Sequence, residues 1–415
     1  YTGTNASLGN ETVILSDTTV AAADLNTIAA ATGAITATAA TTITGAAAAV
    51  ETAMQDGTIT DNADVAVTIT DTTVDAEAIN DIDGLTTGVV TASSATAISG
   101  IYTEVNTALS ANAATPATIA GLGAANVTLT DATVTVDQVN AIDANTTGII
   151  TATIAATETH AELATLTGTG NALTITTPAA TATAAQLNTA NGATTLAVNA
   201  AATTGIVTSS FADINTLYTA AAAGEITGLG NETITPGVAV TVAQANSLAG
   251  FTTGLVTATI SDGDIATLSG LVSDTAADGT TAFPNALTIT VTDTTVSAAA
   301  LNVLDAKTTI DVDATATTTL TGTLTDVVAA YAAEGAGETV NLDGDEAVTI
   351  SDTGVISAAD VNTINAATSG LVTLSGVTGL TGTAAAVTAA FTANSGAGGV
   401  TGLPLVTGTT VASGI

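Results

Sequence analysis

The sequence predicts a repeat solenoid, specifically a right-handed parallel β/α solenoid built from β-strands and short capped helices. Three observations lead to this fold class. An apolar–Asn–x–apolar motif recurs seven times along 415 residues, alternation of aliphatic residues with Thr precedes it, and Gly follows most copies. A strand–helix–strand order without hairpin turns implies parallel strands joined by right-handed crossovers. About 14 strand–helix turns, arranged as seven double repeats, then fill the chain.

The strands are expected where aliphatic residues alternate with Thr, because a period of two is typical of a half-buried strand. We expect the aliphatic side chains to face the helices and the Thr side chains to face away. Strands before the motif are expected at 67–70, 127–130, 173–176, 287–290 and 348–351. A second set, after the glycines, is expected at 34–38, 89–92, 149–153, 206–208, 255–259 and 371–373.

Each motif is expected to form a helix of about two turns. Five residues before its Asn stands an N-cap position, and six of the seven copies place a capping residue there. These positions are Ala21, Asp75, Thr135, Thr183, Thr241, Ser297 and Ser357. Gln138, Gln186 and Gln244 follow three residues later and approximate a capping box. Weaker helices are expected after the second strands, at 101–109, 160–166, 211–217, 323–330 and 383–391.

The repeated Asn forms a column with two interpretations. Its members are Asn26, Asn80, Asn140, Asn188, Asn246, Asn302 and Asn362. The column is either a structural ladder that bonds to backbone groups of adjacent turns or a row of solvent-facing helix residues. The sequence leaves both open.

We expect one continuous solenoid over residues 1–415. Its approximate double repeats are 9–62, 63–122, 123–170, 171–228, 229–283, 284–344 and 345–415. A chain that starts at Tyr1 is expected to be a processed product or a fragment. Both ends resemble internal junctions, so either the chain is cut from a longer array or identical subunits stack end to end and cap each other.

Charge and composition exclude several classes of partner. The chain has one Lys or Arg, 37 Asp and Glu and no Cys, for a formal net charge of -36. Nucleic acid and anionic lipid surfaces need basic patches that this chain does not have. No apolar run approaches the ~18 residues of a membrane-spanning helix, so no membrane insertion is expected.

Catalysis has no specific motif in this sequence. The single histidine, His160, stands between Glu158 and Glu162, and we expect it to be a solvated surface residue. No phosphate loop, dinucleotide fingerprint or zinc-protease motif is present. The sequence therefore predicts a protein that is not an enzyme.

Calcium is the cofactor that this composition favours, because hard cations take oxygen ligands and would screen the negative charge. The candidate ligands are Asp81, Asp83, Asp262, Asp264, Asp343, Asp345 and Glu346. The alternative is that these acids lie on turns and keep the protein soluble.

Outward Thr rows are a further candidate surface. Pairs such as Thr68 and Thr70 or Thr128 and Thr130 would repeat along one face. Such rows suit ice binding, a glycan or a neighbouring filament, and Thr is also simply a good strand former.

The repeats resemble secreted bacterial surface-layer proteins and giant "beta-strand repeat" cell-surface proteins of marine bacteria and cyanobacteria. The segment 71–92, with its Asp-Thr-Thr-Val and Thr-Thr-Gly elements, carries this resemblance. It implies an extracellular or cell-surface structural role. We expect a non-enzymatic protein that assembles head to tail with itself into a filament or surface layer, or else the stalk of a large adhesin.

Overall fold

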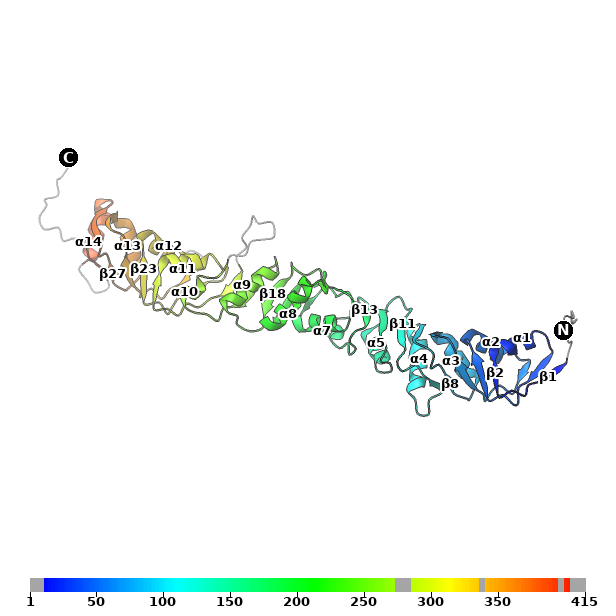
Figure 1. The fold of residues 1–415 in the computed structure, drawn as a ribbon. Coiled ribbons are helices and arrows are strands. Elements are labelled where there is room, and N and C mark those ends of the chain that lie inside the picture. Colours follow the sequence, from blue (N-terminus) through cyan, green and yellow to red (C-terminus); the bar gives the residue numbers. More distant parts are fainter. Residues whose placement is uncertain (1–10, 273–284, 336–339, 395–398, 404–415) are drawn as a thin grey trace. The chain divides into compact units, whose positions relative to one another are not determined.

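The structure is a computed structural model and describes residues 11–272, 285–335, 340–394 and 399–403 (Figure 1). Its contacts divide the chain into two compact units. Unit 1 comprises Tyr1–Ala180, Ala185–Thr203 and Thr219–Gly228, and unit 2 comprises Thr181–Ala184, Thr204–Tyr218 and Leu229–Ile415. Parts of the expected repeats 9–62, 229–283, 284–344 and 345–415 lie outside the described residues.

Helices recur along both units. They are α1 (Ala22–Ala29), α2 (Ala47–Gln55), α3 (Ala76–Leu85), α4 (Tyr102–Ala113), α5 (Val136–Asp143), α6 (His160–Leu163), α7 (Ala184–Gly192), α8 (Phe211–Ala222), α9 (Val242–Phe251), α10 (Ile265–Leu268), α11 (Ala298–Asp305), α12 (Leu324–Gly335), α13 (Ala358–Ala367) and α14 (Ala384–Ala393). Successive helices pack on one another, α1 to α4 in unit 1 and α11 to α14 in unit 2.

The strands of unit 1 form small parallel sheets. One contains β1 (Thr12–Ile14), β3 (Ala34–Thr36) and β5 (Ile59–Thr60). A second contains β2 (Thr19–Ala21), β4 (Thr42–Gly45), β6 (Ala66–Ile69), β8 (Val90–Thr91) and β10 (Ile119–Ala120). A third contains β7 (Thr73–Asp75), β9 (Ala97–Gly100), β11 (Asn126–Leu129), β12 (Ile150–Thr153) and β13 (Ala172–Thr174), and a fourth pairs β15 (Val198–Asn199) with β17 (Ile226–Thr227).

The strands of unit 2 follow the same plan. Its sheets are β14 (Thr181–Ala182), β16 (Gly205–Ser209) and β18 (Thr233–Pro236); β19 (Thr257–Thr259) and β20 (Ala286–Thr288); and β22 (Val312–Asp313) and β24 (Val340–Asn341). The others are β21 (Thr295–Ser297), β23 (Thr319–Gly322), β25 (Ala347–Ile350), β27 (Val372–Thr373) and β29 (Val400–Thr401), and β26 (Gly354–Ser357) with β28 (Val377–Thr381).

All of these strand pairings are parallel, which confirms an α/β repeat of alternating parallel strands and helices. Register partners carry the same kind of side chain. Ile43, Val67 and Val90 lie opposite one another on β4, β6 and β8 and are fully buried. Their Thr neighbours on the same strands point the other way, as the alternation predicts.

Helix capping follows the predicted column. Ala21, Asp75, Thr135, Thr241, Ser297 and Ser357 are the N-caps of α1, α3, α5, α9, α11 and α13. Thr135 with Gln138 and Thr241 with Gln244 form complete capping boxes. Ser297 caps no amide with its side chain, so side-chain capping is a common but not a uniform feature of the motif.

The expected weaker helices are α4, α6, α8, α12 and α14. The helix expected at 160–166 is shorter than predicted, because α6 ends at Leu163. The capping box of Thr159 and Glu162 defines where this helix begins. The core between helices and sheets consists mainly of Ala, Val, Ile and Leu side chains. Within the described residues, no helix is long and apolar enough to span a membrane.

Candidate functional site

Six residues of the Asn column bond their own helix to the layer that follows it. In unit 1, Asn26 Nδ2 donates to the carbonyl oxygen of Ala49 at 2.9 Å, and Asn80 Nδ2 donates to that of Glu104 at 2.9 Å. Asn140 Nδ2 donates to the carbonyl oxygen of Thr165 at 2.9 Å. Of the two interpretations, the structure therefore has the hydrogen-bonded one at these positions.

Unit 2 repeats the same contact. Asn246 donates to Gly270, Asn302 to Asp326 and Asn362 to Ala386, at 2.8, 3.0 and 2.9 Å. The remaining member of the column, Asn188, lies in α7. The acceptors stand 24 residues after their Asn in all three cases, so one Asn links two consecutive layers.

Two of these Asn residues also accept hydrogen bonds. Asn140 Oδ1 accepts from the amide of Thr167 at 3.1 Å, and Asn246 Oδ1 accepts from the amide of Val272 at 3.0 Å. Both partners follow the four-residue helices α6 and α10, whose last carbonyls and following amides have few helical partners. The amide side chain supplies a donor and an acceptor there, so it closes the end of a very short helix.

A second link, which the sequence analysis did not identify, is made by a side chain that reaches back to the preceding layer instead of forward to the following one. The Asp of the Asp-Thr-Thr-Val element accepts a hydrogen bond from the first amide of the preceding helix. Asp71 Oδ2 accepts from Ala47 N of α2 at 2.6 Å, and Asp131 Oδ2 accepts from Tyr102 N of α4 at 2.6 Å. Sequence reasoning saw the repeated Asp but not its partner, because the partner lies in another layer.

Unit 2 contains the same carboxylate link. Asp293 accepts from Ile265 N of α10 at 2.6 Å, and Asp352 accepts from Leu324 N of α12 at 2.5 Å. A carboxylate at a helix N-terminus satisfies an amide without an intrahelical partner and interacts favourably with the helix dipole. The acids are thus used to join layers.

The Thr-Thr-Gly element forms a third link. Thr146 is buried, and its hydroxyl donates to the carbonyl oxygen of Ala125 at 2.9 Å while accepting from the amide of Gly148 at 3.0 Å. A Cβ on Gly148 would overlap that carbonyl group of Ala125, so only glycine allows the close approach of the two chain segments. Thr86, Thr252 and Thr368 donate in the same way to Val65, Glu232 and Glu346.

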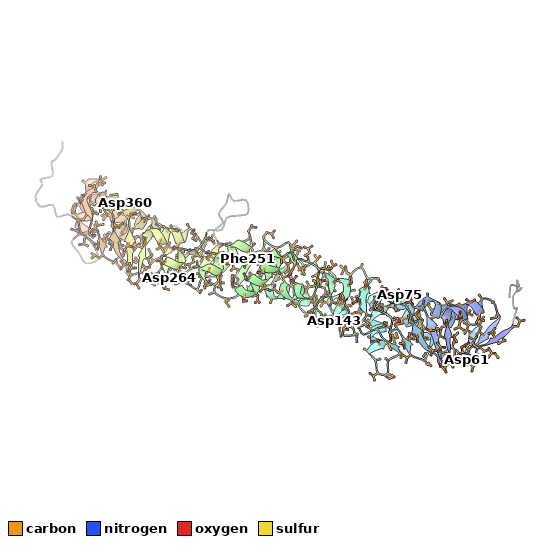
Figure 2. All side chains as sticks on the ribbon, viewed as in Figure 1. Asp61, Asp75, Asp143, Phe251, Asp264 and Asp360 are labelled. Carbon is orange, nitrogen blue, oxygen red and sulfur yellow. The ribbon has the colours of Figure 1, made fainter. Side chains whose placement is uncertain are left out.

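The candidate calcium ligands are distributed over three separate places. Asp262 accepts from the amide of Val242 at 2.7 Å. Asp264, which is labelled in Figure 2, caps α10 by accepting from the amide of Thr267 at 2.9 Å. Hydrogen bonds from Thr267 lower the pKa of Asp264. These two carboxylates serve helix N-termini, one the start of α9 and the other the start of α10.

The other candidate ligands have different roles. Asp83 accepts from the hydroxyl of Thr118 at 3.0 Å, while Asp81, Asp343 and Asp345 are exposed. Glu346 is fully buried, and its carboxylate accepts from the Tyr331 hydroxyl at 3.0 Å. In the part of the chain that the structure describes, no three His, Asp or Glu side chains gather as a metal site would require.

The interpretation of His160 as a surface residue is wrong. Its side chain is 5% exposed, and Nε2 lies 3.4 Å from the hydroxyl oxygen of Thr203. Thr203 in turn lies 3.0 Å from the Thr177 hydroxyl. Burial lowers the pKa of His160, because it penalises the charged imidazolium. His160 is the first residue of α6, and its ring packs inward instead of facing solvent.

The Thr rows follow the strand register. Thr44, Thr68 and Thr91 are partners on β4, β6 and β8, and all three are half-buried. In unit 2, the row Thr321, Thr349, Thr373 and Thr401 crosses β23, β25, β27 and β29 and is also half-buried. These two rows repeat from strand to strand and are half-buried, whereas Thr70, Thr128 and Thr130 of the predicted pairs are exposed.

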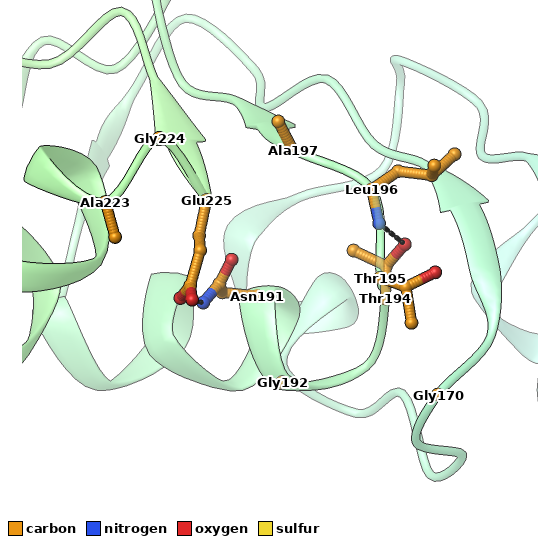
Figure 3. Close-up of a pocket in the computed structure, with 10 residues that line it drawn as sticks. All are labelled: Gly170, Asn191, Gly192, Thr194, Thr195, Leu196, Ala197, Ala223, Gly224 and Glu225. Carbon is orange, nitrogen blue, oxygen red and sulfur yellow. Dashed lines mark hydrogen bonds between the residues drawn. The ribbon is translucent and has the colours of Figure 1, made fainter.

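A surface cavity of about 480 Å³ lies in unit 1 (Figure 3). Its polar side consists of Asn191, whose Nδ2 donates to Glu225 Oε2 at 3.2 Å, and of Thr194, whose hydroxyl accepts from the amide of Leu196 at 3.1 Å. Both polar pairs are already satisfied within the chain. The cavity therefore presents one exposed carboxylate and no nucleophile–base pair.

The polar groups described above bind one layer of the chain to the next, and none of them is arranged as a catalytic set. Comparisons with protein-family models, with curated proteins and with solved structures returned no match to this chain.

Proposed function

We propose that this chain is an extracellular structural protein that assembles end to end with copies of itself into a filament or surface layer. The proposal includes a single right-handed parallel β/α solenoid as the architecture of the assembled protein. It also includes membership of the same class as the repetitive bacterial surface proteins, whose Thr- and Ala-rich repeats this sequence resembles.

One observation supports the proposal most strongly: the same hydrogen bonds of Asn and Asp side chains join successive layers in both units. A layer donates through an Asn to the next helix, and it accepts at an Asp from the previous one, as Asn80 and Asp71 do. A contact that is directional and repeated has the form of a head-to-tail interface, which generates open filaments when its rotation does not close.

The composition supports a role in which surface chemistry is simple. A single cation leaves the surface without trypsin-type cleavage sites other than Lys307, an advantage for a protein exposed to proteases. The high negative charge disfavours random association between copies, so contacts confined to the ends are the favoured ones.

Negative-stain microscopy of the purified chain, with sedimentation analysis, tests the proposal. Long unbranched fibres support it, and discrete particles at every protein concentration contradict it and favour the stalk of a larger adhesin. The same experiment with calcium and with a chelator tests the metal. Loss of fibres in chelator would make the exposed acids Asp81, Asp343 and Asp345 the first candidates as ligands.

A further inference from the structure

The first layer of the chain carries one half of an internal junction. Asp17 opens the first Asp-Thr-Thr-Val element and corresponds to Asp71, which caps the helix before it. Asp17 is exposed and has no hydrogen-bond partner within residues 11–272, 285–335, 340–394 and 399–403. Its carboxylate is an acceptor for a helix N-terminus that the described chain does not place there.

The last helix, α14, carries the other half. Its N-cap Thr383 accepts from the amide of Ala386 at 3.2 Å, as a normal cap does. The amide of Ala384, the first residue of α14, has no acceptor among the residues that the structure describes. Within the given sequence, no Asp or Glu follows Asp360.

Apolar residues in the first and last described layers are less buried than their internal equivalents. Val50 in α2 is fully buried, whereas Val387 at the equivalent place in α14 is only half-buried. Val67 in β6 is fully buried, whereas Val13 at the equivalent place in β1 is half-buried. Val50 and Val67 are covered by adjacent layers, whereas the described residues cover Val387 and Val13 only in part.

The strand edges are also complementary. β1 pairs only with β3, and β28 pairs only with β26, so each has an unpaired parallel edge within the described residues. A surface groove of about 440 Å³ beside β2 and α1 includes Leu15, Asp17 and Val20. An exposed strand edge is a template for a further strand.

Charge favours the same pairing of ends. Residues 361–415 contain no charged side chain, the longest such stretch in the sequence, while the N-terminal end presents Asp17 and Asp24. Two copies of a chain with a net charge of -36 repel each other least where one of them is uncharged. The N-terminus of α14 adds a partial positive charge at that place.

We propose that the first layer of one copy docks on the last layer of a second copy of this chain. The carboxylate of Asp17 accepts the amide hydrogen of Ala384, and β1 pairs in parallel with β28. The inference rests on the proposed end-to-end assembly and specifies its contact. In the internal equivalent, β4 with β6, Thr44 lies opposite Thr68. The same register places Thr381 opposite Ile14 of the next copy.

The hydrogen bond is tested first from the acceptor side. Asp17→Ala is expected to raise the concentration at which half of the chain sediments as polymer by about tenfold, the usual effect of losing a helix cap. Asp17→Asn keeps an acceptor oxygen and is expected to give a smaller shift. Asp64→Ala is the matched control, because Asp64 is an exposed acid away from both ends and its removal changes the charge equally.

The donor side offers a sharper test. Proline at the first position of a helix is compatible with the helix but has no amide hydrogen, so Ala384→Pro deletes only the proposed donor. We expect the same tenfold shift, whereas Ala384→Ser should behave as the unchanged chain. The double variant of Asp17→Ala and Ala384→Pro should be no weaker than either single one, because both remove the same bond.

The register is tested by cross-linking, since the chain has no Cys of its own. Ile14→Cys combined with Thr381→Cys should form covalent multimers on oxidation, because Cα atoms on adjacent strands lie within disulfide range. Each single variant should give no product larger than a dimer. Thr44→Cys with Thr68→Cys, the internal pair, should close within one chain and shows that the geometry permits the bond.

Two outcomes overturn the inference in distinguishable ways. Fibres that are unaffected by Asp17→Ala and Ala384→Pro, with no multimers from the cysteine pair, leave the proposed assembly standing and refute this contact. An unchanged chain that neither sediments as polymer nor cross-links at any concentration refutes the assembly itself.

Discussion

Asn140 and Thr165 are joined across two layers of the repeat by a hydrogen bond of 2.9 Å from Nδ2 to the carbonyl oxygen. The same Asn accepts from the amide of Thr167 through Oδ1. One side chain thus satisfies both a carbonyl and an amide where the short helix α6 ends. It is the clearest case of a contact whose equivalents recur along both units.

Asn140→Ala should destabilise the protein measurably. It leaves a carbonyl and an amide without their partner, a loss of about 1–3 kcal/mol. Thermal unfolding followed by circular dichroism is the measurement. Asn106→Ala is the control, because Asn106 holds the equivalent place in α4 and has no side-chain hydrogen bond within the described part of the chain. Equal melting temperatures for the two variants would refute a structural role for the column.

Asp71→Ala should weaken the link between α2 and the following layer. It removes the acceptor of the buried Ala47 amide, and loss of an N-cap costs about 1 kcal/mol. We expect a lower urea midpoint, and Asp71→Asn should recover part of the loss because it keeps an acceptor. Asp64→Ala, which alters the charge to the same extent, should leave the midpoint unchanged. A drop of the same size in that control would assign the effect to charge alone.

Gly148→Ala and Gly84→Ala should act in opposite directions. A Cβ on Gly148 would overlap the carbonyl group of Ala125, and overpacking of this kind costs about 1–3 kcal/mol. Nothing lies within 4 Å of a Cβ on Gly84, which stands inside α3, so alanine there should stabilise the helix by about 0.5–1 kcal/mol. Differential scanning calorimetry of the two variants gives the signs directly, and a shared sign would contradict the close approach at Gly148.

His160 should make stability depend on pH. Its unfolded pKa is the ordinary 6.5, and burial lowers the folded value, so between the two only the unfolded chain binds the proton. The stability that the buried neutral ring provides is therefore complete above pH 6.5 and is lost as the pH falls below it.

Melting temperatures from about pH 7.5 to about pH 5.5 measure this effect in the unchanged chain and in His160→Gln. The unchanged chain should lose stability relative to the variant as the pH falls. Parallel curves would show that another group is responsible.

Much of the fold was predictable because its causes are local. The alternation at 127–130 predicts β11, and the Thr135–Gln138 box predicts the start of α5, since both depend on residues within one turn or one strand. The recurrence of the Asn indicated a shared role without deciding between the two interpretations. The partners of Asp71 and Asn80 and the burial of His160 were not predictable in this way, because each depends on a residue at least 24 positions away.

The sequence by itself determined the periodic elements: alternating strands, capped helices and an overwhelmingly acidic surface without catalytic motifs. Only the tertiary structure decided what the repeated polar residues do. Asp, Asn and Thr side chains have short reach and many chemically equivalent partners, so their role is set by which backbone groups the stacked layers bring within hydrogen-bond distance. The layers bring helix amides to the Asp residues, and they bring backbone carbonyls in or just after the next helix to the Asn residues. The repeat is joined together through those contacts.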